Sequence, residues 1–242
     1  IPEFLSLLKG AIDSTDIPLN VSRSSLQGDP NIKKIANYVV KKVADELKKF
    51  VKQDRAKYES IWEDIGLFVK YGCVSDTKFD EQMREFVIFK NSEGKYSTLE
   101  EYRQSIPENY KEKMKELVLY FEKGKADYTI RKQLLSEGIH ALEVDTHIDP
   151  HFMQHTETHS SGDKKIKFSS LDAEVANIFG SDNATEEDSK IKELFQNCLV
   201  PATKTTGDEK ASGPVDNLEI TLERVRNSTT PAYFKTDEQM KR

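Results

Sequence analysis

The sequence contains few cysteines and no long apolar run, and each shortage excludes a class of protein. Only Cys73 and Cys198 occur among 242 residues, whereas a small secreted domain held together by disulfides carries more cysteines at closer spacing. We therefore expect two free thiols and a reducing, cytoplasmic location. No apolar stretch approaches the ~20 residues that a membrane-spanning helix requires. A membrane partner is therefore not expected.

An excess of basic charge is also missing. The 36 Lys and Arg residues are outnumbered by 42 Asp and Glu, and the formal net charge is −6. Neutralising nucleic-acid phosphates requires a net basic face, so nucleic acid is not an expected partner. Large side chains are present, with 12 Phe and 9 Tyr. The chain can therefore build real cores, and its length suffices for two or three modules.

The first half of the sequence has the periodicity of helices. Residues 1–10 are expected to form an amphipathic helix or its end. A long helix is predicted to start at Asp29-Pro30, because Asp is a good N-cap and Pro is tolerated at the first helical position. Apolar residues then recur at spacings of three and four, which predicts one buried stripe. These residues are Ile32, Ile35, Ala36, Val39, Val43, Leu47 and Phe50.

Further helices are predicted up to residue 105. One runs through 58–68 and is expected to end near Gly72, since glycine suits a left-handed C-terminal position. The next is predicted over 79–89, which carries apolar residues on one side. Ser97 with Glu100 matches the capping-box pattern, which predicts the start of a short helix.

The pattern then changes to alternating strands and helices. Residues 117–121 form a short continuous apolar run, typical of a strand buried on both faces. Helical spacing follows over 127–137, Gly138 supplies a stop, and 139–144 is a second predicted strand. This order predicts a parallel βαβ unit. Another helix is expected to start at Asp149-Pro150.

The last part of the chain is more polar. Residues 181–190 are predicted to be an acidic linker, and 191–199 a short helix. Alternation over 218–222 predicts a half-buried strand. Thr236 with Gln239 forms another capping-box pattern just before the sequence ends, and the first residue is Ile1 rather than Met. We therefore expect a piece of a longer protein.

One segment carries a specific family resemblance. Residues 12–23, IDSTDIPLNVSR, with Leu26-Gln27 beyond them, resemble the catalytic-loop signature of the ninety-kilodalton heat-shock chaperones, in their bacterial form. Three weaker matches follow in the family's order. Residues 58–68 resemble its helical coil, 138–149 its small α-β-α subdomain, and 230–232 a short signature of its C-terminal domain.

The resemblance implies a layout for the chain. The fold class expected is a helix-rich α+β fold: a helical coil, then a small α-β-α sandwich, then a partial α+β C-terminal domain. Residues 1–29 would end the large middle subdomain and hold the catalytic loop, and 30–105 would form the coil. Residues 106–182 would form the small subdomain, and 183–242 the truncated start of the dimerisation domain.

The resemblance also assigns roles to a loop. The family's arginine at the position of Arg23 contacts the γ-phosphate of ATP, and Asn20 and Gln27 match its polar companions. A planar guanidinium offers bidentate donors to phosphate oxygens, which suits that task. The family usually has an acidic residue after the arginine, where this chain has Ser24. This departure removes a salt-bridge partner.

The implied cofactors and partners belong to the longer protein. ATP and Mg²⁺ would be bound by an N-terminal ATPase domain, and none by this chain, so the chain alone is expected to be inactive. The implied partners are non-native client proteins, that ATPase domain, and a second copy in a homodimer. The alternative is a helical adaptor, a protein–protein interaction module without a catalytic role.

Two further sets of residues invite a functional interpretation. Trp62, Phe152 and Met153 are candidate client contacts, although aromatic residues at helical spacing more often belong to a core. His151, His155 and His159 are spaced by four on one predicted helix, as in some zinc sites. No Cys lies near them and the HExxH pattern is absent. A solvated helix face is therefore preferred to a metal site.

Overall fold

The computed structural model describes residues 2–10, 30–124, 128–179 and 190–195. The residues of the predicted catalytic loop, Asn20, Arg23 and Gln27, and the predicted strand at 218–222 lie outside this part of the chain. In chain order the elements are η1 (Glu3–Leu5), α1 (Pro30–Gln53), α2 (Arg55–Ser75), α3 (Thr77–Met83), η2 (Arg84–Phe86), β1 (Ile88–Lys90), β2 (Tyr96–Thr98), α4 (Leu99–Ser105), η3 (Glu108–Tyr110), β3 (Leu117–Glu122), α5 (Tyr128–Ser136), β4 (Leu142–Val144), α6 (Asp149–His159), η4 (Gly162–Lys164), β5 (Lys167–Ser170) and α7 (Leu171–Phe179).

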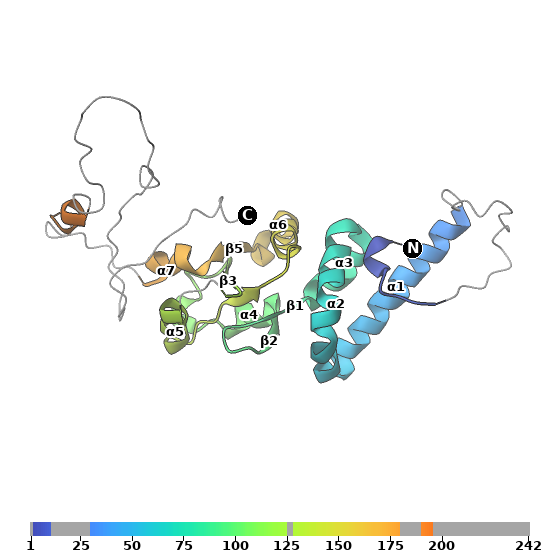
Figure 1. The fold of residues 1–242 in the computed structure, drawn as a ribbon, viewed down its shortest axis with the longest axis horizontal. Helices are drawn as coiled ribbons and strands as arrows, with labels where there is room; N and C mark the ends of the chain where they lie inside the picture. The colour runs from blue at the N-terminus through green and yellow to red at the C-terminus, as the bar shows by residue number, and fades with distance from the viewer. Residues whose placement is uncertain (1, 11–29, 125–127, 180–189, 196–242) are drawn as a thin grey trace, which may run out of the picture.

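The described part is elongated (Figure 1). Helices α1, α2 and α3 gather at one end, and the sheets with α4, α5 and α7 lie towards the other. Helix α6 contacts α2 on one side and β5 on the other, so it joins the two ends. The predicted helix-rich α/β fold is confirmed, with one sheet of two strands and one of three.

The first helices arise largely as the sequence predicts, with one difference at the start. The helix expected over 1–10 is only the single 3-10 turn η1, whose Phe4 and Leu5 are buried. Helix α1 begins at Pro30 as predicted. Helix α1 packs against α2 and α3, but the predicted stripe is not its most buried side: the fully buried side chains among those described on α1 are Val40 and Ala44, which lie outside the stripe. The stripe itself is half-buried, except for Phe50, which is exposed.

Gly72 does not end the second helix, as had been predicted. Helix α2 continues to Ser75, and the next helix starts at once because Asp76 accepts a hydrogen bond from the Phe79 amide at 2.9 Å. A Cβ at Gly72 would lie 2.7 Å from ring atoms of both Phe4 and Phe79. The glycine is therefore needed for close packing: it lets η1 and α3 approach the backbone of α2.

The helix predicted over 79–89 is wrong beyond residue 86. Helix α3 and the turn η2 occupy 77–86, and the backbone of Val87 is extended, with ψ of 131°. Phe89 therefore lies on strand β1, paired antiparallel with Ser97 of β2. The capping box is one residue later than predicted: Thr98 accepts from the Glu101 amide at 3.1 Å, and Glu101 accepts from the Thr98 amide at 2.7 Å.

The predicted βαβ unit is confirmed. Strand β3 is buried over its four central residues and pairs in parallel with β4, Tyr120 opposite Leu142. Helix α5 connects them, and Gly138 has φ of 75°, the left-handed conformation expected at the helix end. Strand β4 is shorter than the predicted 139–144.

A third strand was not predicted. Strand β5 pairs in parallel with β3 on its other edge, Val118 opposite Phe168, which gives the order β4-β3-β5. Helix α7 contacts both β3 and β5. The hairpin formed by β1 and β2 also joins this sheet, through a bridge between Asn91 and Leu142. The hairpin and α4 therefore share a core with residues beyond the boundary expected at 105.

Helix α6 starts where predicted. It begins at Asp149, with Pro150 in its first turn, and ends at His159. Residues 190–195 are helical, within the short helix predicted over 191–199. Of the helices in the described ranges, none combines the length and the apolarity needed to cross a membrane.

Burial protects one of the two thiols, which leads to a prediction. Cys73 is fully buried in α2, and burial raises the pKa of its thiol to about 12. In a Cys198→Ser variant, we expect iodoacetamide at pH 8 to label Cys73 at least ~100-fold more slowly in the folded chain than in guanidinium, because the thiolate is the reactive form. Mass spectrometry measures the labelled fraction.

The same thiol makes stability dependent on pH. An unfolded cysteine ionises near pH ~8.5, while folded Cys73 keeps its proton to about pH 12. Above pH ~8.5 the unfolded state therefore binds fewer protons than the folded state. The free energy of unfolding consequently falls as the pH rises from ~8.5 towards about 12. Labelling of the folded chain within minutes at pH 8 would contradict the burial of Cys73.

Candidate functional site

The described elements hold both flanks of the predicted catalytic loop. On its N-terminal side, the Phe4 ring packs on Phe79 with centroids 4.8 Å apart, and Glu3 accepts a hydrogen bond from the Tyr71 hydroxyl at 3.2 Å. On its C-terminal side, α1 packs against α2 and α3. The three-helix end therefore anchors both sides of the segment that carries Arg23.

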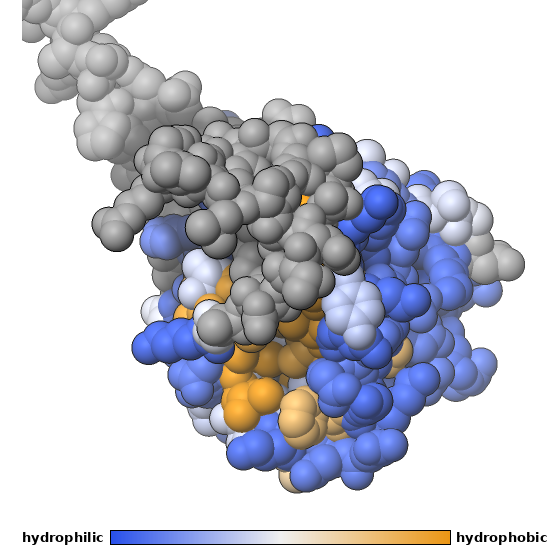
Figure 2. All heavy atoms as spheres, turned by 90° about the vertical axis from the view of Figure 1, so that its right-hand side faces the viewer, coloured by the Kyte–Doolittle hydropathy of each residue, from blue (hydrophilic) through white to orange (hydrophobic). Residues whose placement is uncertain are grey.

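Exposed apolar side chains occur near that segment. Figure 2 shows apolar atoms gathered on the face at the α1 end of the molecule. Leu7 and Leu8, just after η1, are each 49% exposed, and Phe50 near the end of α1 is 38% exposed. The other residues of the apolar stripe of α1 are half-buried. This face can therefore still bury apolar area against another surface.

The three candidate client contacts are buried, which favours the core interpretation over the client-contact interpretation. Trp62, Phe152 and Met153 are 5%, 0% and 1% exposed. The Trp62 ring packs on Tyr58 with centroids 5.3 Å apart, and the Phe152 ring packs on Phe89 at 6.1 Å. These side chains lie in the hydrophobic core because α2, β1 and α6 meet there, so they offer no surface to a client.

The histidine stripe does lie on one helix, but it is not a uniformly solvated face. His151 is exposed, whereas His155 is half-buried, and its ring stacks on His159 with centroids 4.1 Å apart. His155 Nε2 lies 3.1 Å from a carboxylate oxygen of Asp80, without hydrogen-bond geometry. Within the described residues, no group of three or more His, Cys, Asp or Glu could hold a metal ion.

Asp80 on α3 lies close to His155 and also binds Arg84, which contacts the backbone of His159. Its carboxylate is 1% exposed and accepts from Arg84 Nε at 2.9 Å as well as from Nη2. Arg84 also donates to the carbonyl of His159 at 3.3 Å, at the C-terminal end of α6. Burial, with His159 and Arg84 nearby, lowers the pKa of His155. The neutral imidazole is therefore the stable form beside this paired carboxylate.

A second buried ion pair joins α2 to α6. Lys70 donates to Asp149, and the two residues are 6% and 1% exposed. The other oxygen of Asp149 accepts from the amides of Asp145 and Thr146, at 3.0 and 2.9 Å. The Lys70 ammonium also lies 4.5 Å from the ring centroid of Phe89. This pair therefore fixes the junction between the helical end and the sheet.

Sequence reasoning identified Asp149 only as a helix start, and it missed Lys70. One signal was available: Lys70 follows Trp62 and Gly66 on the side of α2 that is buried, where a cation needs a partner. Its partner is 79 residues away in the sequence. That separation leaves no local pattern from which the pair could be found.

Comparison with known proteins gives the family. A family model described as Hsp90 protein matches residues 1–216. Chaperone protein HtpG of Bacteroides thetaiotaomicron is 31% identical over 245 residues, which cover 100% of this chain and 35% of the relative. HtpG of Bacteroides fragilis is 37% identical over 176 residues, covering 72% of this chain and 25% of the relative. HtpG of Porphyromonas gingivalis is 41% identical over 154 residues, covering 63% and 22%.

These matches reach well beyond the catalytic-loop segment, because the family model covers the described helices and sheets together. The chain spans between 22% and 35% of the length of these relatives. The predicted resemblance is confirmed at the level of the family and of its bacterial form. The chain belongs to the Hsp90 family, with the bacterial HtpG-type chaperones.

Proposed function

We propose that this chain is the central part of an ATP-dependent chaperone that binds non-native proteins. The observation that carries the proposal is the family match over 1–216, which includes the segment from Asn20 to Gln27. The relatives are named as chaperone proteins. Arg23 would complete an ATPase site whose nucleotide pocket lies on another domain, with Asn20 and Gln27 supporting the loop.

The chemistry proposed for Arg23 follows from its side chain. Phosphoryl transfer spreads negative charge over the oxygens of the transferring group, and a cation placed there stabilises the transition state. Arginine keeps its charge and donates in a planar fork that matches two phosphate oxygens. ATP and Mg²⁺ would be held by the other domain, and Arg23 would only reach them.

The exposed apolar face at the α1 end suits a neighbouring domain. Leu7, Leu8 and the half-buried stripe of α1 flank the proposed catalytic loop in sequence. A domain packed there would bury apolar surface and hold the loop near the nucleotide. Homodimerisation and a cytoplasmic location complete the proposal. Its alternative, a helical adaptor, predicts that the loop has no catalytic role.

Comparing chain lengths tests this proposal. We expect no ATP turnover above background from the 242-residue chain alone, and measurable turnover from a longer protein in which it follows a family ATPase domain. The ATPase domain alone is the control and should turn over ATP at least ~10-fold more slowly than the longer protein, because one charged donor to the phosphoryl group is worth that much or more.

The readouts are phosphate release and suppression of aggregation of a heat-denatured client. The adaptor alternative predicts equal turnover by the ATPase domain with and without this chain. That result would remove the catalytic part of the proposal. A longer protein that turns over ATP but leaves client aggregation unchanged would remove the client-binding part.

A further inference from the structure

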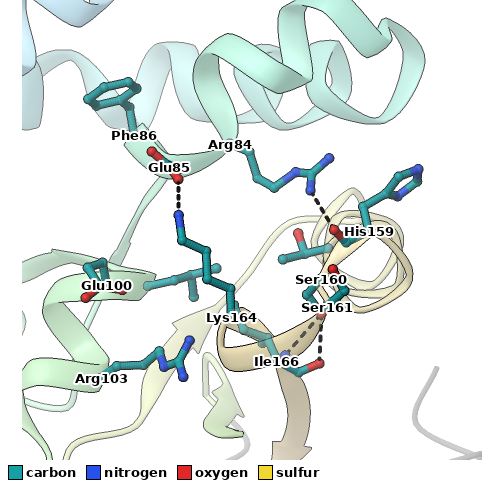
Figure 3. A pocket seen from close by; sticks show the side chains of 12 residues that line it. Arg84, Glu85, Phe86, Glu100, Arg103, His159, Ser160, Ser161, Lys164 and Ile166 are labelled. Atoms are coloured by element: carbon teal, nitrogen blue, oxygen red, sulfur yellow. Dashed lines mark hydrogen bonds and ion pairs between the residues drawn. The ribbon is translucent and has the colours of Figure 1, made fainter.

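A cleft of about 570 Å³ opens between η2, α4 and the C-terminal end of α6 (Figure 3). Its walls come from three distant parts of the sequence, at 84–86, 99–103 and 156–166. Among the described residues, the buried candidates Trp62, Phe152 and Met153 do not line it. Its volume falls in the range of ~300–1,000 Å³ that is usual for binding sites.

Apolar side chains line part of this cleft. Phe86 and Ile166 are half-buried, and Leu99 is 8% exposed. Phe86 is fixed because its carbonyl accepts a hydrogen bond from the Tyr58 hydroxyl at 3.0 Å. Leu99 is fixed because it directly follows the capping-box residue Thr98 at the start of α4. The apolar surface is therefore held in place by the fold and can receive a large apolar side chain.

Charged side chains of both signs surround the cleft. Arg84, Arg103 and Lys164 line the cleft against two carboxylates, Glu85 and Glu100. The His159 ring lies on the Arg84 side (Figure 3). Arg84 is already paired with the buried Asp80. A ligand carboxylate beside an apolar group can therefore pair with the exposed Lys164.

One ion pair links two sides of the cleft. Lys164 Nζ lies 2.9 Å from Glu85 Oε1, and these side chains are 78% and 73% exposed. An exposed pair of this kind contributes little to stability, so Lys164 can exchange Glu85 for another carboxylate at little cost. Arg84, in contrast, is anchored by the buried Asp80.

We propose that this cleft binds an extended segment of a partner protein in which a large apolar side chain is flanked by Asp or Glu. The apolar side chain packs on Phe86, Leu99 and Ile166. A flanking carboxylate takes the place of Glu85 on Lys164. This inference goes beyond the ATPase role, and it holds whether or not Arg23 acts in catalysis.

The test uses the full chain and a short fluorescent peptide with a central Leu-Phe pair flanked by glutamates. Fluorescence polarisation should show saturable binding that weakens with added salt, because screening reduces the attraction between exposed charges. Replacing Leu-Phe by Ala-Ala should weaken binding at least ~10-fold through lost apolar burial. Replacing the glutamates by lysines should abolish it.

Adjacent lysines provide a matched pair of variants. Lys164→Glu should weaken peptide binding ~10-fold, because reversing one charge places a carboxylate against the ligand's own. Lys165→Glu makes the same charge change beside it, yet Lys165 does not line the cleft and pairs with Glu116 instead. This control should change binding less than ~2-fold. Both lysines are exposed, so both variants should fold, which circular dichroism checks.

Two results would overturn the inference. Equal weakening by Lys164→Glu and Lys165→Glu would mean that the peptide is attracted by positive charge in general. Displacement of the peptide by low-millimolar inorganic phosphate would mean that the cleft is a small-anion site. Because peptide binding is measured without nucleotide, neither result bears on ATP turnover.

Discussion

Replacing Arg23 by alanine in a longer protein that carries the ATPase domain is expected to lower kcat for ATP hydrolysis by ~100-fold or more. The expected size follows from the loss of one charged donor to the transferring phosphoryl group. Nucleotide affinity should change much less, because the proposed pocket lies on another domain. Phosphate release gives kcat, and titration with a fluorescent nucleotide gives the affinity.

Two variants make this result specific. Arg23→Lys keeps the charge and loses the bidentate geometry, so it should recover only part of the activity. Lys34→Ala removes an exposed cation from the nearby helix α1 and should leave kcat within ~2-fold. If Arg23→Ala hydrolysed ATP at the unaltered rate while remaining folded, the proposed catalytic role would be wrong.

Replacing Lys70 by methionine is expected to lower the free energy of unfolding by ~3–5 kcal/mol, the usual cost of removing one partner from a buried ion pair. The Asp149 carboxylate, 1% exposed, would keep its two amide donors and lose its cation. Its negative charge would then remain buried without a compensating cation. Urea unfolding followed by circular dichroism measures the change.

A double-mutant cycle separates the pair from its surroundings. Asp149→Asn alone leaves the buried Lys70 ammonium without its carboxylate partner. In the combined variant, Lys70→Met with Asp149→Asn, neither charge of the pair remains. We therefore expect the combined loss to be smaller than the sum of the single losses by at least ~1 kcal/mol. Lys95→Met, from a pair exposed to 76% and 45%, serves as the control and should cost less than ~1 kcal/mol. Additive losses would show that the pair does not couple α2 to α6.

The local sequence pattern was sufficient to predict those elements that are long or that begin with a strong start signal. Helix α1 follows from its Asp-Pro start and its apolar stripe, and β3 follows from an unbroken apolar run. Helix α6 follows from Asp149-Pro150. Periodicity and cap chemistry act within a few residues, so the chain itself carries this information.

Short strands were missed for a physical reason. Strand β1 has three residues, and the apolar spacing before it, Phe79, Met83 and Phe86, is helical. Strand β5 has Phe168 as its only apolar residue, yet Ser169 and Ser170 are buried with it. Ser169 is satisfied by a hydrogen bond to Glu174 at 2.9 Å. Pairing with β3, not side-chain pattern, makes this segment a strand.

The candidate sites divide in the same way. Asn20, Arg23 and Gln27 stand together in one linear signature, so the sequence alone was enough to nominate them, and their role stays a prediction. Phe152 and Met153 could not be assigned from pattern, because a buried and an exposed apolar side chain can have the same helical spacing. Their burial depends on β1 and α2 covering α6.

The sequence by itself determined the family, the main helices and the βαβ unit, and it nominated the segment that carries Arg23, because each depends on contiguous residues. Only the tertiary structure decided which surfaces are left open. It paired Lys70 with Asp149 and brought Arg84, Arg103 and Lys164 around one cleft. Contacts between residues tens of positions apart depend on how helices and strands pack. No local pattern records that packing, which is why the cleft could be found only in the folded chain.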